Sequence, residues 1–359
     1  MSVESARHLR LLIESVAAVA RPMTGTSTRA ATPSLDRLIA RAEREPFPEP
    51  ELEPITPGRT QRLAREFHVT LPAGADFPVG AVTRLADGGA ADDGYWLRAD
   101  PVHLIPHARG MQMIGSEHLD LTSEEVLALA TELRPLLAER QCVLEVRAPT
   151  RWTLRAPRDL DATATPLDDY GMVAGIALPC GPDGGWLRAI INDTQLALHA
   201  SPVNAGRSAR GVPPVNSLWL WGGGRLPEAG AAPLSALWAD DPVATGLAIA
   251  AGITHHAAPP NAARWLADLT QAASGHHLLV LAMHGSADAE QYDPEQTMQS
   301  LENFWIAPLL AALGARAIAS VTLVSPDAPA LTLTRNNMWR FWRRRTLRPV
   351  YPAASQLGL

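Results

Sequence analysis

Residues 202–227 combine glycines and arginines in a pattern that could bind an anion. A predicted strand at 216–221 runs into three consecutive glycines, Gly222, Gly223 and Gly224. Exposed backbone N–H groups at such a turn can cradle a phosphate or carboxylate. Arg207 and Arg225 would add guanidinium groups, which pair with these anions in a bidentate way. The alternative is a tight turn beside a tryptophan-rich core with solvated arginines, since a triple glycine is an unspecific motif.

A second candidate is the carboxylate and imidazole of Asp100 and His103. The predicted strand at 95–98 should end at Pro101, which would place Asp100 at its tip and His103 just beyond it. Such a pair, three residues apart on a turn, could share a metal ion or a proton. Alternatively, Asp100 caps neighbouring backbone amides, as aspartates in turns commonly do.

His284 is the third candidate, in the run Met283-His284-Gly285. It follows the apolar residues 278–282, which are typical of a central strand covered on both faces. Open α/β sheets build their binding sites at the carboxyl ends of such strands. Asp288 follows closely, so the segment could bind a ligand.

The segment 336–359 is basic and aromatic, and Trp339 and Trp342 alternate with arginines at its start. Aromatic rings and arginines together could bind single-stranded nucleic acid. Alternatively, the two tryptophans dock on the core and the arginines lie in solvent. The formal net charge of -6 favours docking, so we predict neither a nucleic-acid nor a membrane partner.

Composition limits the class of protein. The chain has 359 residues, of which 47% are hydrophobic and 19% charged, as in a folded domain rather than a disordered chain. All 31 basic residues are arginines, which excludes lysine Schiff-base chemistry and a P-loop lysine. No apolar run reaches the ~18 residues of a membrane span. Two isolated cysteines, Cys142 and Cys180, suit a reducing compartment, and we predict a cytoplasmic protein.

Strands and helices alternate along most of the chain, which predicts a layered α/β fold. We expect a helix after Thr32-Pro33, a capping box at Thr122 and Glu125, and a long helix over 293–314 bent near Pro308. We also expect strands at 8–13 and 79–85, a loop at 204–214 and a hairpin at 317–334. The proline- and glutamate-rich residues 46–57 read as an exposed connector. Because little chain precedes this connector, we predict a single domain over 1–359.

Several segments resemble an RpfE-type family of bacterial regulatory proteins, which is itself similar to cofactor-independent phosphoglycerate mutases. They are residues 94–104, 202–204 and 213–227, with 339–344 near the C-terminus. Residues 32–36, Thr-Pro-Ser-Leu-Asp, resemble the Thr-Pro-Asn-Leu-Asp helix start of the alkaline-phosphatase-like superfamily. The resemblance implies an alkaline-phosphatase-like fold with a mixed, mostly parallel central sheet flanked by helices. It also adds two residues of the matching segments, Asn204 and Asn216, to the candidate ligand-binding residues.

For chemistry, the resemblance implies two divalent ions held by aspartates and histidines around a serine or threonine nucleophile. Active members place an aspartate after the first strand, where this chain has Glu14-Ser15. They place Asp-His-Gly after a late central strand, where this chain has Met283-His284-Gly285. Because Met283 supplies no hard oxygen ligand, the repulsion between two cations would be poorly offset.

Two functions follow from these departures. The first is a cytoplasmic regulatory protein that binds a small anionic ligand or a partner protein with little or no catalysis, and without a cofactor. The second is a phosphomutase or phosphatase dependent on Mn, Mg or Zn. Its altered ligand set would be Glu14, Asp100, His103, His284 and Asp288, with Ser15 as nucleophile. The candidate ligand-binding residues are Asp100, His103, Asn204, Arg207, Asn216, Gly222, Gly223, Gly224, Arg225 and His284.

Overall fold

A computed structural model describes most of the chain. The described residues are 6–13, 32–45, 58–71, 75–107, 110–167, 172–174, 177–228, 230, 232–269, 274–281, 294–326, 328–340 and 342. Several sequence predictions therefore lie outside them: Glu14, Ser15, Met283, His284, Asp288 and the connector 46–57.

The chain divides into two compact units, where the sequence predicts one domain. Unit 1 comprises Met1–Glu51, Ala232–Ala244 and Gly252–Leu359, and unit 2 comprises Leu52–Ala231 and Thr245–Ala251. The first boundary falls inside the connector 46–57. The single-domain prediction assumed that the short N-terminal stretch could not form a core. That stretch belongs instead to a discontinuous unit, which the C-terminal part of the chain completes.

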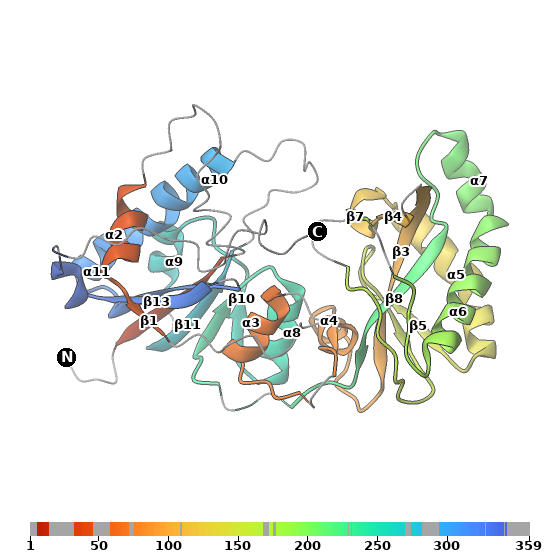
Figure 1. Ribbon diagram of the computed structural model, residues 1–359, viewed down its shortest axis with the longest axis horizontal. Helices are drawn as coiled ribbons and strands as arrows, with labels where there is room; N and C mark the ends of the chain where they lie inside the picture. Colours follow the sequence, from red (N-terminus) through yellow and green to blue (C-terminus); the bar gives the residue numbers. More distant parts are fainter. Residues whose placement is uncertain are drawn as a thin grey trace, which may run out of the picture. The chain divides into compact units, whose positions relative to one another are not determined.

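Unit 1 is built on a seven-stranded mixed sheet in the order β10-β9-β11-β1-β12-β13-β2 (Figure 1). Its five parallel strands are β1 (Arg7–Leu12), β9 (Ala236–Trp238), β10 (Thr254–His256), β11 (Gly275–Val280) and β12 (Ser320–Ser325). The antiparallel strands β13 (Ala328–Thr334) and β2 (Glu43–Arg44) complete it. The predicted strand at 8–13, the central strand near 278 and the C-terminal hairpin are confirmed.

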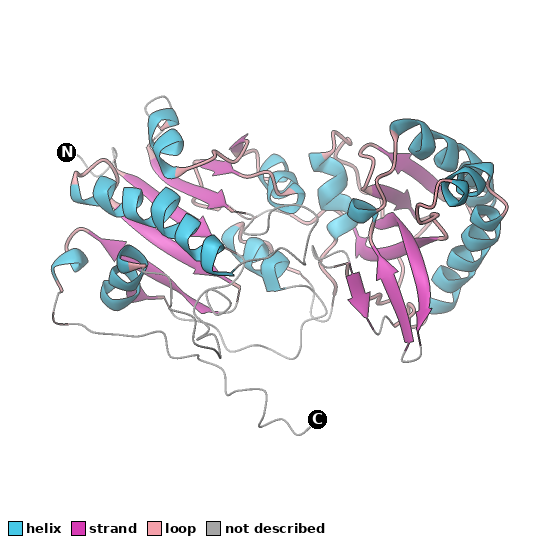
Figure 2. Cartoon of the chain, turned by 90° about the horizontal axis from the view of Figure 1, so that it is seen from above, coloured by secondary structure: helices cyan, strands magenta, loops and turns pink. Residues whose placement is uncertain are grey.

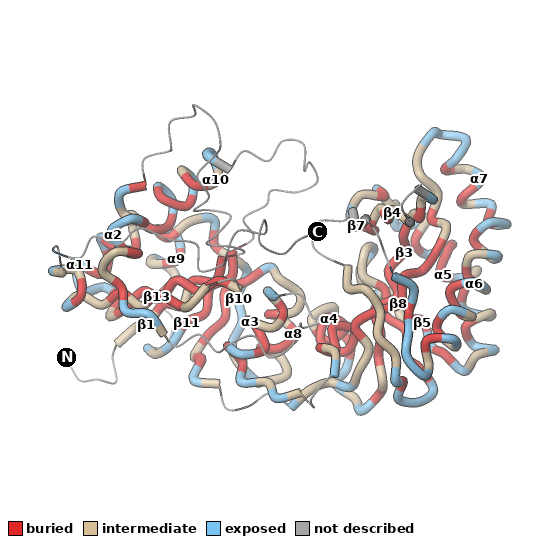
Figure 3. The backbone as a smooth tube through the Cα atoms, viewed as in Figure 1, coloured by how far each residue is buried: buried red, intermediate tan, exposed pale blue. Residues whose placement is uncertain are grey.

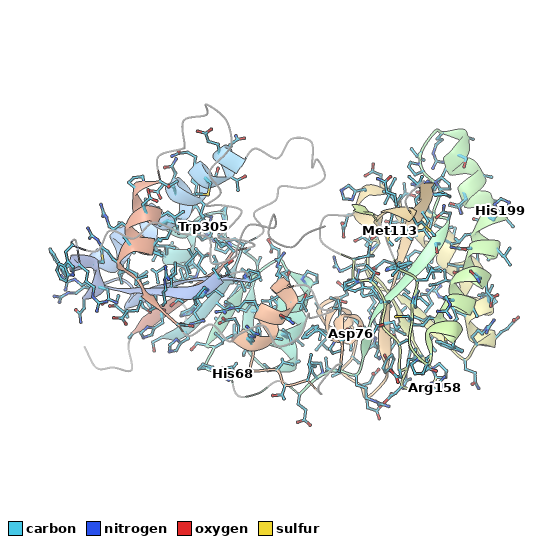
Figure 4. The ribbon with its side chains drawn as sticks, viewed as in Figure 1. His68, Asp76, Met113, Arg158, His199 and Trp305 are labelled. Atoms are coloured by element: carbon cyan, nitrogen blue, oxygen red, sulfur yellow. The ribbon has the colours of Figure 1, made fainter. Side chains whose placement is uncertain are left out.

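Helices cover one face of this sheet (Figure 2). They are α2 (Pro33–Arg41), α9 (Ala262–Asp268), α10 (Pro294–Leu301), the π-helical turn η4 (Glu302–Ile306) and α11 (Ala307–Gly314). Leu9, Leu11 and Ile13 alternate along β1 and all face this layer, where Trp305 of η4 also packs (Figure 4). The sequence places the irregularity of the long helix near Pro308, and the π-turn immediately precedes it. The helix is continuous through η4 into α11, and the Ala307 N–H bonds to the Glu302 carbonyl, so Pro308 follows a point where the regular i→i−4 ladder is already interrupted.

Unit 2 is built on an antiparallel sheet in the order β5-β6-β3-β4-β7, with β8 pairing β3. Its strands are β3 (Trp96–His107), β4 (Gly110–Ile114), β5 (Val143–Val146), β6 (Trp152–Arg155), β7 (Met172–Ala174) and β8 (Ser217–Gly224). The long strand β3 is its centre, and both β3 and β8 are largely buried (Figure 3).

Helices α5 (Ser123–Glu139) and α6 (Gly184–His199) pack on one face of the unit 2 sheet. The capping box at Thr122 and Glu125 is confirmed. The remaining helices of this unit are α3 (Gly58–Glu66), α4 (Val79–Ala86) and α7 (Pro202–Ala209), and part of α8 (Pro242–Ala250). The short 3-10 helices are η2 (Ser116–His118) in unit 2 and η5 (Asn337–Trp339) in unit 1. No helix among the described residues is long and apolar enough to cross a membrane.

Two element predictions in unit 2 are wrong. Residues 79–85 form helix α4 rather than a strand, because a short apolar run that is buried nearly all round has no clear period. Residues 202–209 form helix α7 rather than a loop. There Pro202 takes the first helical position, which proline favours, and Gly206 is tolerated inside the helix.

Gly246 should resist substitution because helices α8 and α4 meet at this residue. A Cβ at Gly246 would collide with the backbone carbonyl of Val82 in α4. We expect Gly246→Ala to lower the free energy of unfolding by about 1–3 kcal/mol, as overpacking does. Gly206→Ala in α7 is the matched control, since its Cβ would meet only the Arg210 side chain, 3.8 Å away. That control should stabilise by up to about 1 kcal/mol through helix propensity. Urea unfolding of both variants checks the difference, and equal effects would contradict it.

Candidate functional site

Asp100 lies inside strand β3 and not at its tip. The sequence expects Pro101 to end the strand, but β3 continues through it to His107. On one edge β3 pairs with β6 up to Arg98 and with β4 from His103, whereas β8 pairs along its other edge. Pro101 falls in the interval between β6 and β4. A missing N–H therefore costs no ladder hydrogen bond on that edge.

The Asp100 carboxylate is buried and used by the protein itself. Its Oδ1 accepts hydrogen bonds from the Arg98 guanidinium, at 3.0 Å from Nε and 2.5 Å from Nη2. Its Oδ2 accepts one from the indole Nε1 of Trp221 at 2.8 Å. Burial raises the pKa of Asp100, while Arg98 and the N–H donors of Trp221 and Trp152 act in the opposite direction. Both oxygens of Asp100 are thus occupied by Arg98 and Trp221, and a carboxylate whose charge is already offset by a guanidinium is a poor ligand for a metal ion.

His103 and Asn216 fasten β3 to the chain around β8. The His103 ring nitrogen Nδ1 lies 2.7 Å from the carbonyl oxygen of Pro214. The Asn216 side chain pairs with both backbone groups of Leu104, accepting from its N–H at 2.7 Å and donating to its carbonyl at 2.9 Å. Both side chains therefore have a structural partner, which for His103 is bound through Nδ1.

Asn204 and Arg207 of α7 also bind the protein's own backbone. The Asn204 amide donates to the carbonyls of Leu198 and Val215 and accepts from the Val215 N–H. Arg207 is 1% exposed and donates from Nε to the Pro213 carbonyl at 3.0 Å. Its Nη1 pairs with the Glu125 carboxylate at 2.7 Å. These contacts hold α7 and the residues between α6 and β8 in place.

The three glycines let helix α4 and its flanking residues approach β8 closely. Gly222 has a positive φ of 57°, and a Cβ there would lie 2.8 Å from the Cβ of Val79. A Cβ at Gly223 would meet the Tyr95 hydroxyl, and one at Gly224 would meet Pro78. Close packing thus explains these glycines without a ligand, most strictly at Gly222, where φ is also positive.

Arg225 is the most exposed of the described candidates, at 52% of its side chain. It pairs with Asp159 at 2.7 Å, and this partner is itself 59% exposed. An exposed ion pair of this kind contributes little to stability and can exchange for another anion. The anion-binding hypothesis for residues 222–225 therefore depends on Arg225, and it remains a prediction.

The carboxyl ends of the parallel strands in unit 1 are a second candidate region, which we call the carboxyl edge. Leu12 of β1 is in register with Val280 of β11, so the segments that carry Glu14-Ser15 and Met283-His284 leave neighbouring strands at this edge. Trp238 of β9 is in register with Leu279, so Asp240 and Asp241 follow at the same edge. Sites of open α/β sheets form where parallel strands end.

Sequence reasoning missed Asp240 and Asp241, because the strand before them has only three residues. The sequence feature that could have indicated them is a pair of adjacent aspartates shortly after three apolar residues, 236–238. In the structure, Oδ1 of Asp240 accepts from the Ala258 N–H at 3.0 Å, and Oδ1 of Asp241 accepts from the Ala244 N–H at 2.6 Å. Among the described residues, no group of three or more histidine, cysteine, aspartate or glutamate side chains could hold a metal ion.

The start of α2 is held by a carboxylate from the π-turn. Glu302 is 3% exposed and accepts hydrogen bonds from the backbone N–H groups of Ser34 and Leu35, at 2.8 and 2.9 Å. The negative charge of the Glu302 carboxylate is favourable at this position, because the N-terminus of a helix carries partial positive charge. The Thr32 hydroxyl, expected to cap this helix, makes no such bond and is buried without a partner among the described residues.

Neither described cysteine has the features of a nucleophile. Burial raises the pKa of the Cys142 thiol to about 11, which keeps it protonated at neutral pH. Cys180 is exposed, and its sulfur lies 2.9 Å from the Thr163 hydroxyl. Covalent catalysis through a thiolate has no support in these environments.

Comparison with known proteins relates the chain to phosphoglycerate mutases over part of its length. No family model matches the sequence. The 2,3-bisphosphoglycerate-independent phosphoglycerate mutase of Methanosarcina acetivorans is 31% identical over 156 residues, which are 39% of this chain and 36% of the relative. The enzyme of the same name from Methanosarcina barkeri is 28% identical over 184 residues, or 46% of each chain. The matches thus span less than half the length of these curated relatives.

Among solved structures, the PH0037 protein from Pyrococcus horikoshii superposes with a TM-score of 0.55 at 15% identity. The superposition covers 92% of this chain and 88% of PH0037, and it supports the α/β fold with a mixed, mostly parallel sheet. The fold-class prediction is confirmed. Over part of its length, the chain is thus homologous to 2,3-bisphosphoglycerate-independent phosphoglycerate mutases.

Proposed function

We propose that this chain is a regulatory protein on a phosphoglycerate-mutase-like scaffold, with little or no phosphoryl transfer. It would bind a small phosphate- or carboxylate-bearing ligand, or a partner protein. The regulatory role rests on the resemblance to the RpfE-type family. The loss of catalysis rests on one observation: at the carboxyl edge, the strand β11 is followed by Ala282-Met283-His284, with no carboxylate before the histidine.

The physical reason is the charge of a dinuclear metal site. Two divalent cations a few ångströms apart repel each other strongly, and anionic oxygen ligands between and around them offset that repulsion. Met283 offers a soft thioether, which divalent ions such as Mn and Mg bind poorly. In unit 2, the Asp100 carboxylate is paired with Arg98 and does not replace the missing ligand.

A second candidate function, a metal-dependent phosphomutase or phosphatase, is favoured by Asp240 and Asp241. They add two carboxylates at the carboxyl edge, and oxygen ligands of this kind suit Mn and Mg. Asp241 is the weaker candidate, because it also caps the start of α8. The altered ligand set would then be Glu14, His284 and Asp240, with Asp288 near in sequence.

Turnover and binding assays with 3-phosphoglycerate separate the two candidates. ³¹P NMR of the full chain with Mn should show no conversion to 2-phosphoglycerate, and aryl phosphate should not be hydrolysed. Metal-stimulated turnover that falls with Asp240→Asn, and not with Asp193→Asn at a 35% exposed position of α6, would establish the enzyme instead.

Binding of 3-phosphoglycerate tests the proposal that the chain binds a small anionic ligand. Calorimetry should detect binding of 3-phosphoglycerate to the full chain. Arg225→Gln should lower the affinity by about tenfold, which is the contribution of one charge-assisted hydrogen bond. Arg264→Gln is the control, because Arg264 forms a similarly exposed ion pair with Asp268 in α9. Equal binding by both variants would remove Arg225 from the site.

A further inference from the structure

Three polar side chains lie in one row across neighbouring strands of the unit 1 sheet. His8 of β1 is in register with His276 of β11 on one side and with Ser320 of β12 on the other. Leu9 and Leu11 of β1 face the helix layer, so His8 points to the opposite face of the sheet. The row lies at the amino ends of the three strands, away from the carboxyl edge, and the proposed function does not use it.

The two imidazole rings are stacked, and His8 is also anchored by the serine. The ring centroids of His8 and His276 lie 4.6 Å apart, with the ring planes inclined by 15°. This separation is close to the spacing of neighbouring strands, so the sheet itself keeps the two rings together. On the other side, Nδ1 of His8 lies 2.9 Å from the Ser320 hydroxyl oxygen, and Ser320 is 6% exposed. The His8 ring therefore loses this contact if it leaves the stack.

The strands that hold the stack present no carboxylate to it. Neither β11 nor β12 contains an aspartate or a glutamate. The next residue of β1 on the same face is Arg10, whose charge is paired with Glu45 at 2.8 Å. Thr334 of β13, in register with Ser320, extends the row without a charge. A second proton on the stack would therefore place two positive rings side by side, with no carboxylate on these three strands to offset their repulsion.

We propose that the His8–His276 stack is an acid-sensitive element of unit 1, which holds at most one proton when folded and so destabilises unit 1 in mildly acidic solution. Burial, and secondly the neighbouring His276, lower the pKa of His8 below its ordinary value of 6.5. The unfolded chain binds this proton at the ordinary pKa. Unit 1 therefore keeps its full stability above about pH 6.5 and loses part of it as the pH falls below that value. The inference is independent of the function proposed above.

A histidine NMR titration of the full chain from about pH 8 to about pH 5 measures the stack directly. His8→Asn and His276→Asn assign the two ring signals by their loss. We expect His8 to titrate below pH 6.5, and its midpoint to rise in His276→Asn because the neighbouring ring is removed. Burial persists in that variant, so the rise should be partial. His255→Asn is the control: His255 is an exposed histidine of β10 in the same unit, and its loss should leave the His8 midpoint unchanged.

Thermal unfolding followed by circular dichroism measures the consequence for stability. The melting temperature should fall between about pH 7.5 and about pH 5.5, and this fall should be smaller by roughly 2–4 °C in His8→Asn. Comparing the two falls, rather than the melting temperatures themselves, removes any cost of the substitution that does not depend on pH. If His8→Asn does not fold, His276→Asn serves in its place, since His276 is exposed.

Three results would overturn the proposal. The first is a His8 midpoint at or above pH 6.5. The second is a low midpoint that His276→Asn leaves unchanged, which would assign the shift to burial alone. The third is a fall in melting temperature that is the same in both variants as in the unsubstituted chain, because the stack would then carry none of the acid sensitivity.

Discussion

Asp100→Ala should lower the free energy of unfolding of unit 2 by about 3–5 kcal/mol, the cost of breaking a buried ion pair from one side. The substitution leaves the Arg98 guanidinium, whose side chain is 9% exposed, without its carboxylate. It also leaves the Trp221 indole N–H without its acceptor. Buried donors without partners carry the full desolvation cost, which is why the effect exceeds that of a lost hydrogen bond. Urea unfolding monitored by tryptophan fluorescence measures it.

Two controls isolate the cause of this loss. Asp159→Ala removes the same group from the exposed pair with Arg225 and should cost no more than about 1 kcal/mol. The double variant Arg98→Leu with Asp100→Leu removes both charges and should recover much of the stability. A small effect of Asp100→Ala, together with a loss of ligand affinity, would instead return Asp100 to the binding site.

Met283→Asp should raise the affinity for Mn²⁺ by about tenfold or more. The change supplies a carboxylate directly before His284, at the edge where β1 and β11 end side by side. A hard anionic oxygen attracts a divalent cation where a thioether does not, and tenfold corresponds to about 1.4 kcal/mol. Isothermal titration calorimetry measures the change.

The control for added charge is Leu196→Asp, at a 73% exposed position of α6 in unit 2. It introduces the same carboxylate in a different unit, so it should leave the affinity for Mn²⁺ unchanged. If Met283→Asp behaves like this control, the absence of a carboxylate before His284 is not what limits metal binding.

Patterns with a strong local cause predicted most of the fold. The apolar run of β11, the capping box of α5 and the hairpin of β12 and β13 each follow from neighbouring residues. The discontinuous unit 1 could not be predicted in this way. Its sheet joins β1 to β11 and β12, and no local signal indicates which distant strands pair.

The site residues show the same limit. Pro101 indicates the end of a strand by itself, but β3 passes through it because β6 and β4 leave a gap there. Asp100 therefore lies in a buried ion pair, whose partner Arg98 is two residues away on the same face of β3. Trp339 is the reverse case. Its type predicts burial, whereas contacts of neighbouring residues with α2 and β2 leave it exposed.

The stoichiometry of bound manganese is the most direct test of the proposed loss of phosphoryl transfer. The purified full chain would be dialysed against Mn²⁺ at about 100 μM, and bound metal measured by mass spectrometry. We predict clearly fewer than two ions per chain, because the carboxyl edge has too few anionic oxygens for a cation pair. Two ions per chain, both lost when His284 and Asp240 are replaced, would contradict this account.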